Sequence, residues 1–253
     1  MRAILLVVYA GAPAIAVVVV AALNHILLTA AQRSDGNVRA ERRTAFIVVG
    51  VLAAWFGLAA ALAINGAFRP TPGRPALIGL FIVLPLIGGL IALVRNKGLR
   101  RLLDDPASQR ALIVLQTYRV GGASFLVMFL LGQLPAIMAM PAGVGDVLTG
   151  AFAYSAFAAL RDGRRGRAIA WNVFGIVDLL VAVTLAVITG PGPTHLITTQ
   201  PSTLALLTTP QVLVPAFIVP LALLMHVASL RGLLSRRTVL TAGPTTAMAA
   251  SGG

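Results

Sequence analysis

The chain has 253 residues, of which 58% are hydrophobic and 11% are charged, with a net charge of +13 and no cysteine. Soluble domains carry about 25% charged residues, so this composition excludes a water-soluble globule. The lack of cysteine excludes disulfides, iron–sulfur clusters, thiolate metal sites and cysteine nucleophiles. The apolar residues come in runs of about 20, the length that crosses a hydrocarbon core, and predict an all-α, polytopic transmembrane bundle.

Seven apolar runs predict the membrane spans of a single domain over residues 1–240. In chain order they are 4–30, 45–66, 76–94, 111–134, 142–160, 168–189 and 211–233. The first run is longer than the apolar region of a signal peptide, so we expect it to be a retained span. The last residues, 241–253, are small and polar and predict a disordered tail.

Basic residues mark every second connection between the spans. Sixteen of the twenty Lys and Arg residues lie in 31–44, 95–110, 161–167 and the end of the chain from Arg231 onward, and three lie on the other side. The positive-inside rule therefore predicts an N-terminus outside and a C-terminus in the cytoplasm, with the chain in the inner (cytoplasmic) membrane of the cell. Because the positive charge follows the connections, it does not indicate nucleic-acid binding.

The connections on the other side are poor in charge. Residues 135–146 predict a tight turn in which Pro141 opens the fifth span. The longest connection, 190–210, is neutral and fairly apolar, and we expect it to lie on the bilayer or to fold over the bundle. Within the fifth span, Ala151, Ser155 and Ala159 recur at four-residue spacing, which predicts a central helix that neighbours approach closely.

A few costly polar side chains lie within the spans. Depths estimated at about 1.5 Å per residue place Arg119, Asp178, His226 and His25 in one layer in the cytoplasmic half of the bundle. The helical repeat predicts that Gln116, Asn172 and Ser229 share a helix face with Arg119, Asp178 and His226, respectively. The predicted ligand-binding or ion-binding cluster comprises Arg119, Asp178, His226, His25, Gln116, Asn172 and Ser229.

Two interpretations of this cluster remain open from the sequence. An Arg119–Asp178 ion pair beside His226 would suit an ion or ligand site, because histidine exchanges protons near neutral pH. The same groups would also suit a hydrogen-bonded network that fixes helix register and moves nothing. Asp146, expected in the first turn of the fifth span, is interpreted as a helix cap or as part of an outer gate.

The best functional hypothesis is a small-solute or ion transporter, or the membrane subunit of one, with Asp178 as the coupling group. The first alternative is a non-catalytic scaffold or partner subunit that meets a membrane-protein partner or another copy of itself in the bilayer. The second is a redox protein with haem between His25 and His226.

An enzyme is not favoured, because neither a nucleophile–base pair nor a His-Glu-x-x-His or Gly-x-Ser-x-Gly motif is present. The single lysine, Lys97, lies in a connection, so a retinal Schiff base in the last span is excluded. We therefore predict no metal site and no resident cofactor, with the haem alternative kept separate.

Overall fold

The computed structural model describes residues 2–34, 36–71, 77–191 and 195–241, with side chains placed between Tyr9 and Ser235. All regular elements in these ranges are helical. Seven stretches are long and apolar enough to cross a membrane: Tyr9–Gln32, Val38–Ile64, Leu77–Arg95, Pro106–Leu130, Ala136–Arg161, Arg165–Ile188 and Val214–Ser235. The predicted all-α bundle with seven spans is confirmed, whereas the tail at 242–253 lies outside the described residues.

The helices follow one another with short connections. Their bounds are α1 (Arg2–Gln32), α2 (Val38–Ile64), α3 (Leu77–Arg95), α4 (Lys97–Asp104), α5 (Pro106–Leu115), η1 (Gln116–Gly122), α6 (Ala123–Leu130), α7 (Ala136–Arg161), α8 (Arg165–Ile188), η2 (Thr203–Leu207), η3 (Val214–Ile218) and α9 (Val219–Thr241). Elements η1 and η2 are 3-10 helices, and η3 is a short π-helix.

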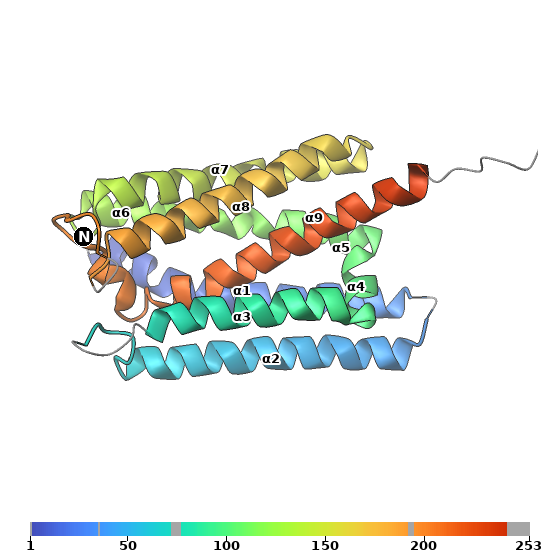
Figure 1. Ribbon diagram of the computed structural model, residues 1–253, viewed down its shortest axis with the longest axis horizontal. Helices are drawn as coiled ribbons and strands as arrows, with labels where there is room; N and C mark the ends of the chain where they lie inside the picture. Colours follow the sequence, from blue (N-terminus) through green and yellow to red (C-terminus); the bar gives the residue numbers. More distant parts are fainter. Residues whose placement is uncertain (1, 35, 72–76, 192–194, 242–253) are drawn as a thin grey trace, which may run out of the picture.

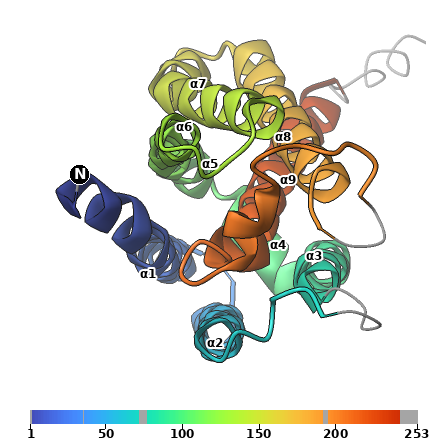
Figure 2. The ribbon, with the colours of Figure 1, turned by 90° about the vertical axis from the view of Figure 1, so that its left-hand side faces the viewer.

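Helix α9 crosses between two groups of helices (Figures 1 and 2). On one side lie α1, α2 and α3, and on the other lie α5 to α8. One face of α9 contributes Leu221, Met225 and Ala228 to the largest apolar core, which it shares with α1 and α4. Ala222 and Leu223 instead pack with Leu179 of α8. The last helix therefore joins both halves of the bundle.

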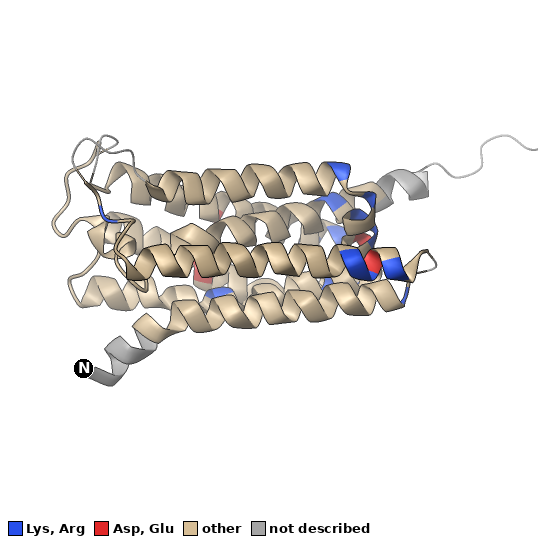
Figure 3. Cartoon of the chain, turned by 90° about the horizontal axis from the view of Figure 1, so that it is seen from below, with Lys and Arg blue, Asp and Glu red and all other residues tan. Residues whose placement is uncertain are grey.

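Charged residues gather at one end of the bundle (Figure 3). We call this the basic end; it comprises the described residues of 33–43, 95–110 and 161–167, together with Arg231. Three ion pairs join helices there, namely Arg33–Asp105 at 3.0 Å, Arg231–Asp104 at 2.6 Å and Arg101–Glu41 at 3.5 Å. Helix α4, within the basic connection at 95–110, buries its leucines against the bundle. The basic end is thus a folded surface and not a set of free loops.

The fourth span consists of three helical pieces. It begins at Pro106, where the Asp105 side chain accepts a hydrogen bond from the backbone N–H of Ser108 at 2.9 Å. The α-helix then tightens into η1 and resumes as α6. A 3-10 stretch in the middle of a helix is uncommon and often marks a functional or strained position. Arg119 lies in this stretch.

Helix α7 corrects two predictions about the fifth span. The helix begins at Ala136, and Pro141 lies inside it, so the expected tight turn at 135–146 is absent. Membrane helices tolerate such a proline because neighbouring groups satisfy the freed backbone. Helix α7 does pack against α5, η1, α6 and α8, but Ala151 and Ser155 are exposed. The small residues buried on its packed face are Ala139, Ala142, Gly143, Gly145, Thr149, Gly150, Ala153, Ala156 and Ala159.

The connection at 190–210 folds back onto the end of the bundle, in the part of it that the structure describes. Thr203 in η2 donates its hydroxyl hydrogen bond to the carbonyl of Ala186 in α8 at 3.1 Å. Leu206 is buried with Met128 of α6 and Met138 of α7. Of the two expectations for this connection, the structure supports the one in which it folds over the bundle.

Candidate functional site

Arg119 occupies the middle of the bundle and is almost fully buried, with 3% of its surface exposed. It lies 13 residues after Pro106 and 11 before Leu130, the two ends of its span. Asp178 is similarly 13 residues after Arg165 and 10 before Ile188. The polar layer therefore lies near the midpoint of the spans and not in the half toward the basic end, because α5 and α8 begin earlier than predicted.

Each guanidinium nitrogen of Arg119 contacts a protein acceptor. Nε donates to Oδ1 of Asp146 at 2.7 Å, and Nη2 lies 2.6 Å from the same oxygen. Nη2 also donates to Oδ2 of Asp178. Nη1 faces the carbonyl of Gly175 at 3.3 Å and Nε2 of His226 at 3.1 Å. We call Arg119, Asp146, Asp178 and His226 the Arg119 cluster.

Hydrogen-bond roles define the protonation of His226. Arginine only donates, so Nε2 of His226 must accept from Arg119. Asn172 donates through Nδ2 to the carbonyl of Ala168 and to Oγ of Ser229, so its Oδ1 is the atom 3.0 Å from Nδ1 of His226. Nδ1 must then carry the proton. His226 is therefore a neutral imidazole protonated on Nδ1.

Two glycines allow these side chains to meet. A Cβ atom on Gly145 of α7 would overlap the Asp178 carboxylate, and one on Gly175 of α8 would overlap the His226 ring. Small residues commonly let membrane helices approach this closely. The positions of Asp178 and His226 thus depend on the bare backbone opposite each.

A second layer fixes the ring of His226 from the side. Trp171 of α8 packs against the imidazole with ring centroids 5.0 Å apart. The Trp171 indole N–H donates to the carbonyl of Thr149 in α7 at 2.9 Å, and the Thr149 hydroxyl donates to the carbonyl of Gly145 at 2.8 Å. Neither Trp171 nor the two glycines was singled out for this role from the sequence. The recurrence of glycines within the fifth span was the sequence signal that could have indicated this close approach of helices.

The structure brings most of the predicted cluster together. Arg119, Asp178 and His226 are in contact, and Asn172 and Ser229 extend the network as described above. Gln116, one turn before Arg119, donates to the carbonyl of Ala222 at 3.4 Å, and its buried Oε1 has no hydrogen-bond partner among the described residues. The predicted Arg119–Asp178 ion pair is present.

Two predicted positions are wrong. His25 is exposed on α1 and makes no side-chain contact with the Arg119 cluster in the described part of the chain. Equal depth did not place it on the same face. Asp146 is ten residues into α7 and pairs with Arg119, so it does not cap the helix.

The haem hypothesis does not fit this arrangement. Axial ligation needs a free ring nitrogen on each histidine. Both nitrogens of His226 are engaged, by Arg119 and by Asn172, and the ring is fully buried. His25 is exposed on another helix. A haem between these two residues would require the Arg119 cluster to be taken apart.

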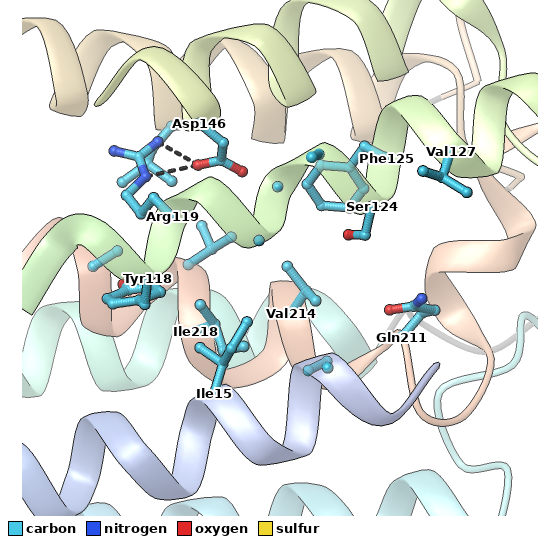
Figure 4. Close-up of a pocket in the computed structure, with 18 residues that line it drawn as sticks. Ile15, Tyr118, Arg119, Ser124, Phe125, Val127, Asp146, Gln211, Val214 and Ile218 are labelled. Carbon is cyan, nitrogen blue, oxygen red and sulfur yellow. Dashed lines mark hydrogen bonds and ion pairs between the residues drawn. The ribbon is translucent and has the colours of Figure 1, made fainter. Parts of the chain in front are cut away.

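A cavity of about 610 Å³ adjoins the cluster. It runs from Arg119 and Asp146 at one end to Gln211 at the other (Figure 4). Its walls come from α1, η1, α6, α7, α8, η3 and α9, and are mostly apolar, with Ile15, Tyr118, Phe125, Val214 and Ile218 among them. A volume of this size and a few converging polar groups are typical of sites for small molecules.

These features define an all-helical, multi-pass membrane protein with a charged cluster in its middle. Residues 75–234 match the model of a family described as a domain of unknown function (DUF8737), which covers more than half of the chain. The chain belongs to this family. The matched range contains every member of the Arg119 cluster, whereas α1 and α2 precede it. Neither curated proteins nor solved structures provide a match.

Proposed function

We propose that this protein is a proton-coupled membrane transporter that binds its solute in the cavity beside Asp146. The observation that carries the proposal is the pair of carboxylates held by one guanidinium at mid-span, next to a cavity. A purely structural ion pair needs one carboxylate for one arginine. The second carboxylate adds a charge that packing alone does not require.

The charges of the cluster leave an excess of one negative charge when both carboxylates are ionised. Arg119 contributes +1, Asp146 and Asp178 contribute −2, and His226 is neutral by its hydrogen bonds. An unbalanced charge at this depth is costly, and like-charged carboxylates that share a site disfavour double ionisation. The cluster is therefore suited to hold one exchangeable proton or, in its place, one cation.

A hydrogen-bonded chain leads from the cluster toward the basic end. His226 connects Arg119 to Asn172, which donates to Ser229. Asn172 and Ser229 lie nearer to the basic end than Asp178 and His226 do, since α8 begins there and α9 runs toward it. The cavity lies on the other side of the cluster, toward Gln211. This order supports a proton route on one side and a solute route on the other.

The basic end is assigned to the cytoplasm in this proposal, according to the positive-inside rule. The absence of native cysteine allows a direct test. A Thr71→Cys variant should react with a membrane-impermeant maleimide in intact cells, and a Gly166→Cys variant should react only after permeabilisation. Labelling in the reverse order would contradict the orientation.

Transport is tested in proteoliposomes with a pH-sensitive dye inside. Amines, amino acids, sugars and carboxylates are added in turn to the purified full-length chain. At least one class should cause proton movement that Asp178→Asn abolishes, while the surface variant Asp162→Asn retains it. A well-folded protein that moves no proton with any class, and that co-purifies with a stoichiometric partner, would support the scaffold alternative instead.

A further inference from the structure

The guanidinium of Arg119 has no donor left for an anionic solute. Its three nitrogens already contact Asp146, Asp178, Gly175 and His226. An anion that entered the cavity would have to displace one of these partners. It would also place a further negative charge beside two carboxyl groups. Binding an anion here would break a buried ion pair, which is strongly unfavourable.

The carboxylate of Asp146, in contrast, keeps one oxygen available. Both contacts with Arg119 go to Oδ1, and Oδ2 accepts no hydrogen bond within the described residues. The Asp146 side chain is 17% exposed, against 2% for Arg119 and 8% for Asp178. Figure 4 shows the two dashed contacts ending on one oxygen, with the other directed away from Arg119. The end of the cavity therefore presents a free acceptor of negative character.

The remaining walls favour an organic ligand over a metal ion. Divalent metal ions such as Ca²⁺ or Mg²⁺ take six or more oxygen ligands. Beyond Asp146, the polar side chains along the cavity in the described structure are those of Tyr118, Arg119, Ser124 and Gln211, spread over its length. An organic cation needs only one charged partner and an apolar surface for its carbon groups.

We infer that the cavity binds a lipophilic organic cation with a single positive charge, which pairs with Oδ2 of Asp146. This inference rests on the proposed function and names its class of solute. The cation takes the place of the one proton that the cluster holds, so one carboxyl O–H bond breaks and one proton leaves for each cation bound. The total charge of Arg119, Asp146, Asp178, neutral His226 and ligand is then zero in both states.

Binding is tested with two ions of the same shape and opposite charge, tetraphenylphosphonium and tetraphenylborate. The full-length chain in lipid nanodiscs is dialysed against each ion, and the uptake by empty nanodiscs is subtracted. Tetraphenylphosphonium should bind saturably at one per chain, and tetraphenylborate should not. Saturable binding of both ions with equal affinity, or of neither, would overturn the inference.

Two variants locate the site. Asp146→Asn should weaken tetraphenylphosphonium binding at least tenfold, while Asp162→Asn at the basic end should leave it within twofold. Ile15→Trp adds bulk to the cavity wall from α1, at a residue outside the Arg119 cluster, and should also weaken binding at least tenfold. This second variant decides the matter if Asp146→Asn does not fold. Unchanged affinity in Ile15→Trp would place the cation elsewhere.

Proton release gives an independent readout. In weakly buffered solution, a pH dye should report one proton released for each cation bound. The affinity should rise tenfold for each unit of pH over the range in which the cluster is protonated. Cation binding with no proton release would contradict the exchange.

Failure of the inference and failure of the proposed function have different signatures. Asp146-dependent binding without any flux into proteoliposomes would keep the cation site and remove transport. Proton-linked flux of another solute, unaffected by tetraphenylphosphonium and by Ile15→Trp, would keep transport and remove the cation site.

Discussion

Asp146 and Asp178 lie on neighbouring helices, and their carboxylates contact the same nitrogen atom, Nη2 of Arg119. The two charges repel each other, and the guanidinium between them compensates for this repulsion. The contact also ties η1, α7 and α8 together at mid-span. The stability of this half of the bundle therefore depends on the balance of three charges and not on one ion pair.

This balance of charges predicts how the free energy of unfolding changes in a single variant of Arg119 and in a double variant that also lacks the charge of Asp178. Arg119→Gln leaves two carboxylates without a cation, and should lower the free energy of unfolding by about 3–5 kcal/mol, the usual effect of removing one partner from a buried pair. Adding Asp178→Asn should recover part of that loss, because it removes one of the repelling charges. Unfolding of the purified variants in mixed micelles measures both. Strictly additive losses would show that the two residues are not coupled.

The close approach of α7 to α8 predicts a strong effect from one methyl group. In Gly145→Ala the new Cβ overlaps the Asp178 carboxylate, so we expect a loss of about 1–3 kcal/mol, as for other overpacked sites. Gly57→Ala in α2 is the matched control, because no atom beyond the local backbone of its own helix lies within 4 Å of its added Cβ. Thermal unfolding compares the two. Equal midpoints would mean that the helices can separate there without cost.

The hydrogen bonds of His226 predict its tautomer. With His25 and His195 replaced by glutamine, a single ¹⁵N-labelled histidine remains. Its nitrogen chemical shifts should report a neutral ring protonated on Nδ1 at pH 7. In Asn172→Leu the acceptor for that proton is lost, and the tautomer preference should weaken. A doubly protonated ring at neutral pH would contradict the charge balance proposed for the cluster.

At the basic end, Asp105 predicts a loss of stability in acid. Partial burial works against the charged form, but hydrogen bonds from the Ser108 backbone and the ion pair with Arg33 prevail and lower the pKa of Asp105 below its ordinary value. A lowered folded-state pKa stabilises the protein above the ordinary range, and this stabilisation is lost as the pH falls through the folded value. The contribution should therefore begin to fall at about pH 4 and be lost as the pH passes below the lowered pKa of Asp105.

The matching variant is Asp105→Ala, which removes the helix cap and should cost about 0.5–2 kcal/mol at pH 7. The difference from the native chain should shrink as the medium is acidified, since the native chain then loses the same interaction. Melting curves recorded at pH 7 and pH 3 give the comparison. A difference that stays constant with pH would assign the effect to packing alone.

Much of the bundle could be predicted from the sequence because two independent patterns agreed, the lengths of the apolar runs and the positions of the basic residues. The lengths of the apolar runs gave seven spans, and the arginines of the basic end separated them into alternating directions. Helical phase then placed Asn172 with Asp178 and Ser229 with His226. Each pair lies on a single helix, so its spacing does not depend on how helices pack.

The errors came from relations between helices. The estimated depth of His25 in the membrane is close to that of His226. Depth alone does not define the rotation of a helix about its axis, and in the structure His25 is exposed on α1. Pro141 predicts the start of a helix that in fact begins at Ala136. That error moved Asp146 to the membrane surface and concealed its pairing with Arg119. The contact that joins three spans could be found only once the rotation of each was known.

The 3-10 segment η1 has a mechanical consequence for these contacts. A 3-10 helix turns about 120° and rises about 2.0 Å per residue, against about 100° and 1.5 Å in an α-helix. Rewinding η1 as α-helix would rotate α6 relative to α5 by about 20° for each converted residue, and would shorten the span. Arg119 lies within the segment, so a change of pitch in this one span would move the guanidinium relative to both carboxylates, with no movement between rigid domains.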